Sequence, residues 1–156
     1  MNIQEGVLDN SSKNLPNRNV RVHSSGGVVY RRNHDSIDIV GCVRHHPHVC
    51  ALPKGTPYKT ENIEQTALRE VQEETGLQVK IDRFIDKIEY TFFKKEERCT
   101  YYKTVYFFLM VAVGGSFFLH DNEFDAVKWI ARDKISVEMS YENEVKIIEK
   151  GISMVG

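Results

Sequence analysis

Three glutamates with helical spacing are the first residues in this sequence that could do chemistry. Glu70, Glu73 and Glu74 stand at positions i, i+3 and i+4, so on a helix they project from one side, within about a third of the circumference. Like charges at these spacings repel each other. A hard divalent cation such as Mg²⁺ reverses that balance, because it binds several oxygen ligands at once. The spacing therefore predicts a metal site displayed on a helix.

The helix that would carry these glutamates is predicted from Asn62 to Thr75. The turn-forming sequence Gly55-Thr56-Pro57 precedes it. Asn62 suits the N-cap, and Gln65 follows three residues later, as in a capping box. Gly76 suits the C′ position that ends a helix. The apolar residues expected to form its buried stripe are Ile63, Ala67, Leu68 and Val71.

The composition is that of a single soluble domain. The chain has 156 residues, of which 41% are hydrophobic and 28% charged. A formal net charge of −1 gives no basic field for nucleic acid or an anionic membrane. The longest apolar run, 105–113, is too short to span a bilayer, and the N-terminus lacks a signal-peptide pattern. Three scattered cysteines without a CxxC pair favour reduced thiols in a cytoplasmic protein.

The order of elements predicts one mixed α/β domain. Residues 1–21 are polar and rich in Asn and Ser, so we expect a mobile tail or peripheral segment, with the domain spanning 22–156. Paired glycines at Gly26-Gly27 would permit close approach of another backbone. A loop broken by proline is expected over 44–48. The predicted strands are 23–30, 37–43 (the first two joined as a hairpin), 77–81, 86–93, 101–113 and 126–130, and a last helix is predicted at 140–151.

A longer motif surrounds the three glutamates. From Gly55, five residues lead to Glu61, seven more lead to Arg69, and 69–77 then reads REVQEETGL. This resembles the signature of the Nudix hydrolase family, in which nine fixed positions fall within twenty-three residues. The resemblance implies an α/β class fold, an α/β/α sandwich with a mixed β-sheet and the motif as a loop-helix-loop. It also implies hydrolysis of a nucleoside diphosphate linked to another moiety.

The resemblance assigns roles within the motif. It implies that the three glutamates are ligands of Mg²⁺, with Mn²⁺ as an alternative, and that the Gly55 carbonyl assists them. Such an ion would neutralise the pyrophosphate and activate the attacking water. Arg69 is implied to orient a glutamate of the same helix, with Glu73 the leading candidate. Glu61, in the loop before the helix, is a weaker ligand candidate or a structural cap.

A further carboxylate outside the motif is a candidate base. Glu123 precedes the segment 127–130, which contains Trp129. Similar enzymes that cleave diadenosine polyphosphates have a glutamate, five variable residues and then a tryptophan with an apolar neighbour here. The resemblance implies that Glu123 is a metal ligand or the general base. Glu73 is the competing base, and an ordinary surface carboxylate is the alternative for Glu123.

Substrate contacts are expected from basic and aromatic residues. The candidate phosphate-binding residues are Arg44, Lys54 beside Gly55, and Lys103, which resembles a lysine of the diadenosine polyphosphate hydrolases. The candidates for stacking on a purine are Tyr90, Tyr102 and Tyr141. Aromatic residues on strands are more often core or cross-strand partners. Tyr141 differs from the other two because it falls at the start of the last helix, where the similar enzymes place an adenine-facing aromatic.

The subfamily that this chain most resembles is the diadenosine tetraphosphate (Ap4A) hydrolases. The shared segments are 52–55 (LPKG), 103–108 (KTVYFF) and 123–130, whereas 90–92 lacks the tryptophan often seen nearby. Other substrates stay open: oxidised or mismatched nucleotides, RNA 5′ ends and diphosphoinositol phosphates. So does a module that binds a nucleotide without cleaving it, although such modules usually lose a metal carboxylate. Both a monomer and a homodimer are compatible with the sequence.

A zinc site is a weaker hypothesis. Three histidines and a cysteine, at 45, 46, 48 and 50, are acceptable zinc ligands in type. Their spacing fits no standard zinc finger, and Pro47 interrupts it. We therefore expect a loop at the rim of the site in which one histidine reaches the substrate.

Overall fold

The structure, a computed structural model, describes residues 16–156. Residues 1–15 of the predicted tail lie outside the described residues. Strand β1 spans Arg18–Asn33, so regular structure begins before the predicted boundary at residue 22. The described chain divides into two compact units, one of residues 16–22 and 89–104 and the other of 23–88 and 105–156.

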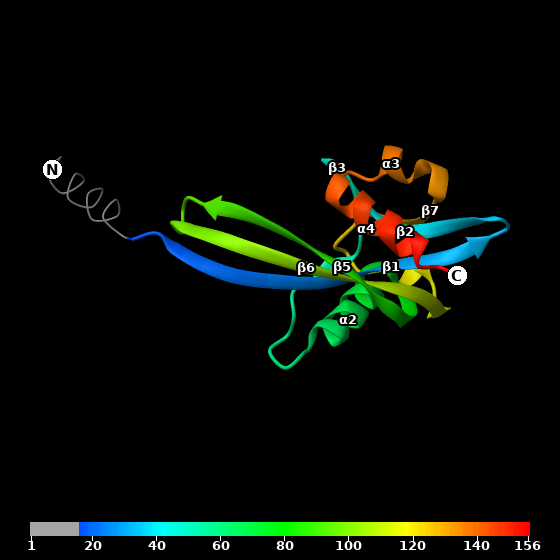
Figure 1. Ribbon diagram of the computed structural model, residues 1–156, viewed down its shortest axis with the longest axis horizontal. Helices are drawn as coiled ribbons and strands as arrows, with labels where there is room; N and C mark the ends of the chain where they lie inside the picture. The colour runs from blue at the N-terminus through cyan, green and yellow to red at the C-terminus, as the bar shows by residue number, and fades with distance from the viewer. Residues whose placement is uncertain (1–15) are drawn as a thin grey trace, which may run out of the picture. The chain divides into compact units, whose positions relative to one another are not determined.

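The larger unit is built on a β-sheet. The strands follow the order β3-β2-β1-β6-β5, with β4 paired to β1 and β7 paired to β2. Strands β1 and β6 run in the same direction and their other neighbours run against them, so the sheet is mixed (Figure 1). The remaining elements are β2 (Ser36–His45), β3 (His48–Ala51), β4 (Lys54–Gly55), α2 (Ile63–Thr75), β5 (Leu77–Lys94), β6 (Cys99–Gly115), η1 (Phe117–Leu119), β7 (Ala126–Ala131), η2 (Arg132–Lys134), α3 (Ile135–Glu138) and α4 (Glu142–Ser153).

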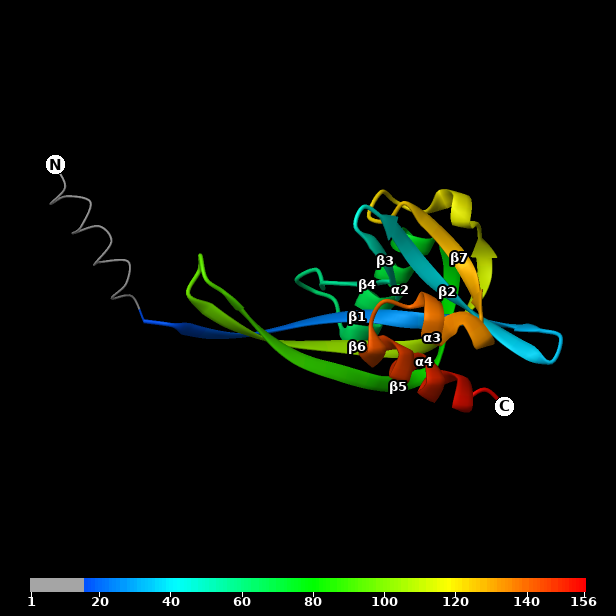
Figure 2. The same cartoon turned by 90° about the horizontal axis from the view of Figure 1, so that it is seen from above.

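Two hydrophobic cores lie on opposite faces of this sheet. Because side chains alternate along a strand, Val28 of β1 packs in the core that includes Ile148 of α4. Its neighbour Val29 packs in the core that includes Val71 of α2. Two perpendicular views place α2 on one face and α4 on the other (Figures 1 and 2). The predicted α/β/α sandwich is confirmed.

The pairing of the first strands confirms the predicted hairpin and corrects the loop after it. Strands β1 and β2 pair antiparallel up to Asn33 and Ser36. The predicted loop over 44–48 is wrong: β2 continues to His45, which pairs with His48, so only two residues form the turn. The predicted close approach at Gly26 is also confirmed, because a Cβ there would lie 2.2 Å from the carbonyl oxygen of Pro53.

Strand β5 is one continuous element where the sequence predicted two strands, 77–81 and 86–93. No glycine or proline interrupts 82–85, so the residues that most strongly break a strand are missing there. Ile85 is buried and packs directly against α4, where a Cβ at Gly151 would lie 2.8 Å from its Cδ1. Burial of this side chain keeps the strand on the sheet.

The two long helices confirm the sequence prediction to within two residues. In α2 the Oδ1 of Asn62 accepts from the Gln65 N–H at 2.8 Å, and the Gln65 Oε1 accepts from the Asn62 N–H at 2.9 Å. Gly76 then ends the helix with φ 78°. Helix α4 buries Ile147 and Ile148. Within residues 16–156, no helix has the length and apolarity needed to cross a membrane.

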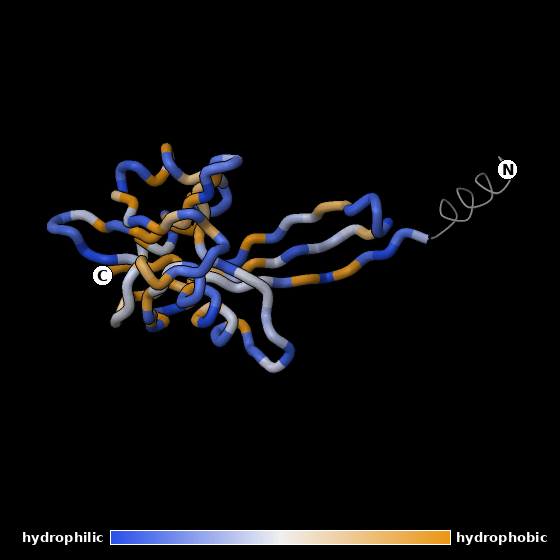
Figure 3. Tube along the Cα trace, turned by 180° about the vertical axis from the view of Figure 1, so that it is seen from behind, coloured by the Kyte–Doolittle hydropathy of each residue, from blue (hydrophilic) through white to orange (hydrophobic). Residues whose placement is uncertain are grey.

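The smaller unit consists of the ends of three strands. Hydrophobic and hydrophilic stretches alternate along them (Figure 3). Phe92 of β5 and Tyr101 of β6 stack with ring centroids 5.1 Å apart. The Arg21 guanidinium lies over the Tyr102 ring at 5.6 Å. Cross-strand aromatic and cation–π contacts of this kind stabilise a sheet.

The end of α2 gives a prediction about stability. A Cβ at Gly76 would lie 2.2 Å from the carbonyl oxygen of Ser116, and φ there is in the left-handed region. Gly76→Ala should therefore lower the free energy of unfolding by more than about 2 kcal/mol, measured by urea denaturation. Gly156→Ala is the control, because a Cβ there meets nothing within 4 Å. Equal stability of the two variants would contradict this reading.

Candidate active site

The predicted metal-binding residues come together at one cavity in the larger unit. It has a volume of about 350 Å³ and lies between α2, β4 and the segment after η1. The lining residues are Lys54, Gly55, Thr56, Glu70, Glu73, Glu74, Asp121 and Glu123. The set includes the ligand candidates Gly55, Glu70, Glu73, Glu74 and Glu123 but not the weaker candidate Glu61. Five of the eight are carboxylates, and Lys54 is the one basic residue among them.

Gly55 allows the backbone of β4 to approach the carboxylate of Glu70. A Cβ at Gly55 would lie 2.1 Å from the carboxyl carbon of Glu70 and 2.2 Å from one of its oxygens. Any other residue would displace that carboxylate. Strand β4 is fixed in turn by its pairing with β1, where Ser25 lies opposite Gly55. The glycine of the motif therefore serves a steric purpose at the site.

Glu74 is the buried member of the carboxylate group, only 4% exposed. Its Oε2 accepts a hydrogen bond from the Lys54 backbone N–H at 2.6 Å. Burial raises the pKa of Glu74 to about 8, and the negative charge of Glu70 adds to the rise. Burial also raises the pKa of Glu70, against the opposing effect of Arg69. Both groups are poorly stabilised as anions without an added cation.

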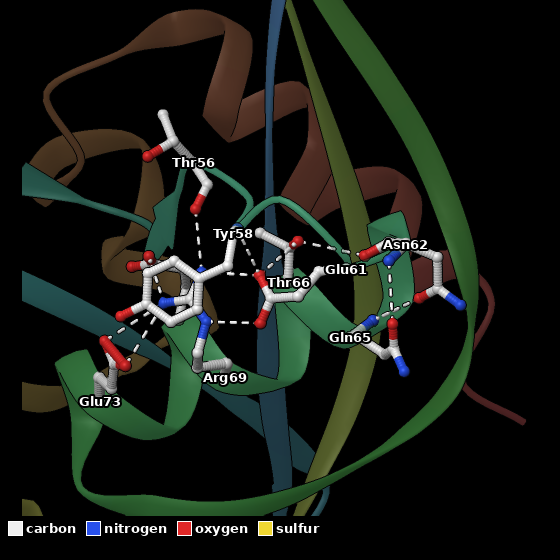
Figure 4. Close-up of polar contacts among 9 residues, drawn as sticks. Thr56, Tyr58, Glu61, Asn62, Gln65, Thr66, Arg69 and Glu73 are labelled. Carbon is white, nitrogen blue, oxygen red and sulfur yellow. Dashed lines mark hydrogen bonds and ion pairs between the residues drawn. The ribbon is translucent and has the colours of Figure 1, made fainter.

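Arg69 bridges the loop before α2 and the helix itself (Figure 4). Its Nε and Nη2 donate to the two carboxylate oxygens of Glu61 at 2.6 and 2.9 Å. Its Nη1 donates to Glu70 at 2.8 Å and to Glu73 at 3.3 Å. A two-pronged pair of this kind is the strong form of an arginine–carboxylate contact, and it lowers the pKa of Glu61 to about 2.

The principal partner of Arg69 is thus Glu61, whereas the sequence favoured Glu73. Glu61 also accepts from the Tyr58 N–H at 2.8 Å and from the Thr66 hydroxyl at 3.0 Å. The guanidinium lies 3.7 Å from the centroid of the Tyr58 ring. Together these contacts close the loop onto α2 and leave Glu61 with a structural role, away from the cavity lining.

Glu123 reaches the cavity because its loop is tied to the end of α2. The Asp121 N–H donates to the carbonyl oxygen of Glu73 at 2.9 Å. The Glu123 N–H donates to Oδ1 of Asp121 at 3.0 Å. The Glu123 side chain is 58% exposed and lies at the rim. Sequence reasoning did not identify Asp121, although its position beside Glu123 was a usable signal.

A second cavity of about 200 Å³ adjoins the first. Both are lined by Lys54, Gly55, Glu74 and Glu123. The other residues of the second cavity are Ser24, Arg44, Val49, Ala51, Leu52, Phe124 and Tyr141. The Arg44 guanidinium lies 4.9 Å from the centroid of the Phe124 ring. The structure thus brings the predicted residues Arg44, Lys54 and Tyr141 together, and adds Phe124, which the sequence did not single out.

The other substrate candidates stay predictions. Tyr90, Tyr102 and Lys103 belong to the smaller unit and line neither of these two cavities. Of the residues considered for zinc, Cys50 is buried with its thiol 3.7 Å from the Met139 sulfur. His45 is exposed, and its backbone N–H donates to Asp125 at 2.7 Å.

The donor set fits a hard divalent cation in charge and chemistry. Carboxylate oxygens and a backbone carbonyl are the ligands that Mg²⁺ and Mn²⁺ prefer. Within residues 16–156 no three His, Cys, Asp or Glu side chains already converge at coordination distance. Arg69 occupies oxygens of Glu70 and Glu73, and the Lys54 N–H occupies one of Glu74. To bind an ion, the side chains of Glu70, Glu73 and Glu74 would leave these hydrogen bonds and turn toward it.

The raised pKa of Glu74 predicts how stability depends on pH without metal. Between the ordinary value of 4.5 and about 8, folded Glu74 keeps a proton that the unfolded chain releases. The folded state then binds more protons, so the free energy of unfolding should fall as pH rises from 5 to 8, by at most about 1.4 kcal/mol per pH unit for one group. Urea denaturation in EDTA measures this slope. Glu74→Gln should flatten it, and an unchanged slope would contradict the assignment.

Comparison with known proteins gives the family. Residues 21–150 match the NUDIX domain. The chain is 32% identical over 142 residues to MutT4 of Mycobacterium tuberculosis, a protein provisionally named a mutator protein. The alignment covers 85% of this chain and 55% of that protein, so the chain spans about half the length of this relative.

Solved structures share the fold. An Ap4A hydrolase from C. elegans, crystallised as a binary complex, aligns with a TM-score of 0.64 at 20% identity, over 85% of this chain and 96% of that one. The NUDIX domain of Shewanella oneidensis NrtR, in complex with ADP ribose, aligns with a TM-score of 0.63 at 16% identity, over 96% of each chain. The motif at the carboxylate cavity, the sandwich around it and the match over most of the chain lead to one conclusion: this chain belongs to the NUDIX domain family.

Proposed function

We propose that this chain is a divalent-metal-dependent hydrolase that cleaves a phosphoanhydride bond in a nucleoside diphosphate derivative, with diadenosine tetraphosphate as its main substrate. The observation that carries the proposal is the pair of adjoining cavities that share Lys54, Gly55, Glu74 and Glu123. One is rich in carboxylates and suits a metal with phosphates. The other presents Arg44, Phe124 and Tyr141 and suits a base. Membership in the NUDIX domain family supports hydrolysis as the reaction.

Glu70, Glu73, Glu74 and the Gly55 carbonyl would hold Mg²⁺ or Mn²⁺. A bound ion of this type neutralises phosphate charge and lowers the pKa of the attacking water. Glu123 is proposed as the group that accepts the proton of that water, because its exposed carboxylate lies at the rim shared by the two cavities. Glu73 is the competing base, since it lines the carboxylate cavity and its contacts with Arg69 are long, at 3.3 and 3.4 Å.

Basic and aromatic side chains would bind the rest of the substrate. Lys54 lines both cavities, so its ammonium can meet phosphates that pass from one to the other. Arg44 and Phe124 already stack on each other, and Tyr141 lines the same cavity. A purine between such groups would gain stacking and cation–π energy.

The free cysteines, all buried, are those expected of a cytoplasmic protein.

A second candidate is hydrolysis of a modified nucleoside triphosphate. The 32% identity with MutT4, provisionally named a mutator protein, favours it. Both reactions use the same metal and water, and they differ in the leaving group. The bound ADP ribose in NrtR raises a third alternative, nucleotide binding without cleavage. Retention of Glu70, Glu73 and Glu74 in the cavity argues against that alternative, because binding alone does not need the full ligand set.

Product analysis in ¹⁸O-labelled water decides between these functions. The purified protein is incubated with Mg²⁺ and diadenosine tetraphosphate, nucleoside triphosphates including oxidised ones, ADP-ribose or capped RNA. We expect Mg²⁺-dependent cleavage with diadenosine tetraphosphate cleaved at the highest kcat/KM, and one ¹⁸O atom in a single product. Faster cleavage of a nucleoside triphosphate would favour the second candidate. Tight binding without cleavage of any substrate would overturn the proposal in favour of a sensor.

The reaction proposed for the carboxylate cavity predicts the effect of changing one ligand. Glu73→Gln should lower kcat by about a thousandfold while the melting temperature changes little, because the side chain is exposed and lines the cavity proposed to hold the ion. Steady-state kinetics at saturating Mg²⁺ measure it. Glu64→Gln is the matched control. Glu64 is an exposed glutamate of the same helix that does not line the carboxylate cavity, so this variant should keep wild-type activity. Near-normal kcat for Glu73→Gln would remove it from the site.

The base-binding role of the second cavity predicts a change in KM. Tyr141 is exposed and lines this cavity at the N-terminus of α4. Tyr141→Ala should raise KM for diadenosine tetraphosphate about tenfold with little change in kcat, since loss of one stacking contact costs on the order of 1–3 kcal/mol. Tyr141→Phe should restore the KM. An unchanged KM in the alanine variant would show that this side chain does not touch the substrate.

A further inference from the structure

Glu144, in the first turn of α4, is a buried carboxylate that the proposed reaction does not use. Its side chain is 2% exposed. Oε1 accepts a hydrogen bond from the Leu52 backbone N–H at 2.9 Å. Oε2 lies 3.4 Å from Nζ of Lys54. Both partners belong to the segment that leads into the carboxylate cavity.

A carboxylate in this position needs an explanation other than stability. Burying a charge costs free energy that a single ion pair rarely recovers, and an apolar residue of similar size is often as stable. The neighbours of Glu144 on α4, Ile147 and Ile148, are apolar core residues. The Glu144 carboxylate therefore contributes more to holding Leu52 and Lys54 in place than to the stability of the core.

The Cys50–Lys54 segment is fixed to the start of α4 at alternate residues. Cys50 and Ser140 exchange two hydrogen bonds: the Cys50 N–H donates to the Ser140 hydroxyl at 2.8 Å, and the Ser140 N–H donates to the Cys50 carbonyl at 2.9 Å. Leu52 and Lys54 are both held by Glu144. The backbone N–H of Lys54 is bonded to Glu74 on α2. Lys54 is thus held from both helices that cover the sheet.

We propose that Glu144 is a positioning residue that fixes the Lys54 ammonium at the boundary of the two cavities, ready to meet the phosphates of a nucleotide. A lysine side chain is flexible, and a ligand that must order it loses affinity. Lys54 is 27% exposed, so its ammonium stays accessible while Glu144 restrains it. This inference rests on the proposed function, in which Lys54 contacts phosphate, and it names the group that prepares that contact.

A double-mutant cycle tests the inference with Mg²⁺ and diadenosine tetraphosphate. Glu144→Gln keeps an acceptor for the Leu52 N–H and removes the charge that holds Lys54. It should raise KM about tenfold and leave kcat within about twofold. In a Lys54→Met background the same change should alter KM less than twofold, because the two residues act through one contact. Glu149→Gln, an exposed glutamate of the same helix, is the control and should match the wild type.

A merely structural role predicts a different pattern. Glu144→Gln would then lower the melting temperature and change kcat and KM by the same factors in both backgrounds, and that result would overturn the inference. Should Glu144→Gln fail to fold, Glu144→Asp replaces it in the same cycle, because it keeps the charge but moves it away from Lys54. Its effect should likewise disappear in the Lys54→Met background, and persistence there would overturn the inference.

Binding of inorganic tripolyphosphate separates this inference from the proposed function. Calorimetry with Mg²⁺ needs no turnover. We expect Glu144→Gln to weaken binding about tenfold, and to have no effect when Lys54 is methionine. If that pattern holds while no nucleotide is cleaved, the proposed hydrolysis is wrong and the positioning role stands. If nucleotides are cleaved but Glu144→Gln changes neither KM nor tripolyphosphate affinity, the positioning role is wrong.

Discussion

Crowding of negative charge around Gly55 is the constraint on which the site depends. Five carboxylates line one cavity of about 350 Å³, and the backbone of Gly55 approaches one of them as closely as a missing Cβ allows. Burial and mutual repulsion raise the pKa of Glu74 to about 8. Such a group of acids is unfavourable by itself and becomes favourable when a divalent cation binds. The fold holds it in place with contacts that offset only part of its negative charge.

Those contacts come from residues around the cavity. Arg69 binds Glu61 with two short hydrogen bonds and so closes the preceding loop onto α2. The Lys54 backbone N–H restrains Glu74, and the Lys54 side chain reaches toward Glu144. Each cationic group therefore connects an element to the site as well as offsetting charge. Strand pairing and hydrogen bonds hold the backbone of the site, and its carboxylates would turn toward a metal.

The parts of this site that the sequence predicts are those set by local spacing. The boundaries of α2 follow from Asn62, Gln65 and Gly76, whose contacts span only a few residues, and the structure has them as predicted. The three glutamates share a helix face for the same reason. The nine fixed positions of the motif between Gly55 and Leu77 were enough to predict a metal site and to indicate the family.

The parts that the sequence could not predict depend on chain segments far apart. Glu144 meets Lys54 across 90 positions, and nothing local marks it as a partner. The pairing of Arg69 with Glu61 depends on how the loop after Gly55 folds back onto α2. Strand β5 is continuous because Ile85 packs against α4. Turn patterns in the sequence give no information on this contact. Lys103 fits a family pattern in sequence, yet it belongs to the smaller unit, as does the stacking candidate Tyr90.

Titration with Mn²⁺ near pH 7 shows whether this group of carboxylates binds a divalent metal. Free Mn²⁺ is followed by electron paramagnetic resonance, and released protons by a pH indicator. Because the pKa of Glu74 is about 8 without metal, we expect binding to release a proton, and Glu74→Gln to lose both tight binding and that proton release. Absence of Mn²⁺ binding to the wild type, or equal binding and proton release in the variant, would contradict the account.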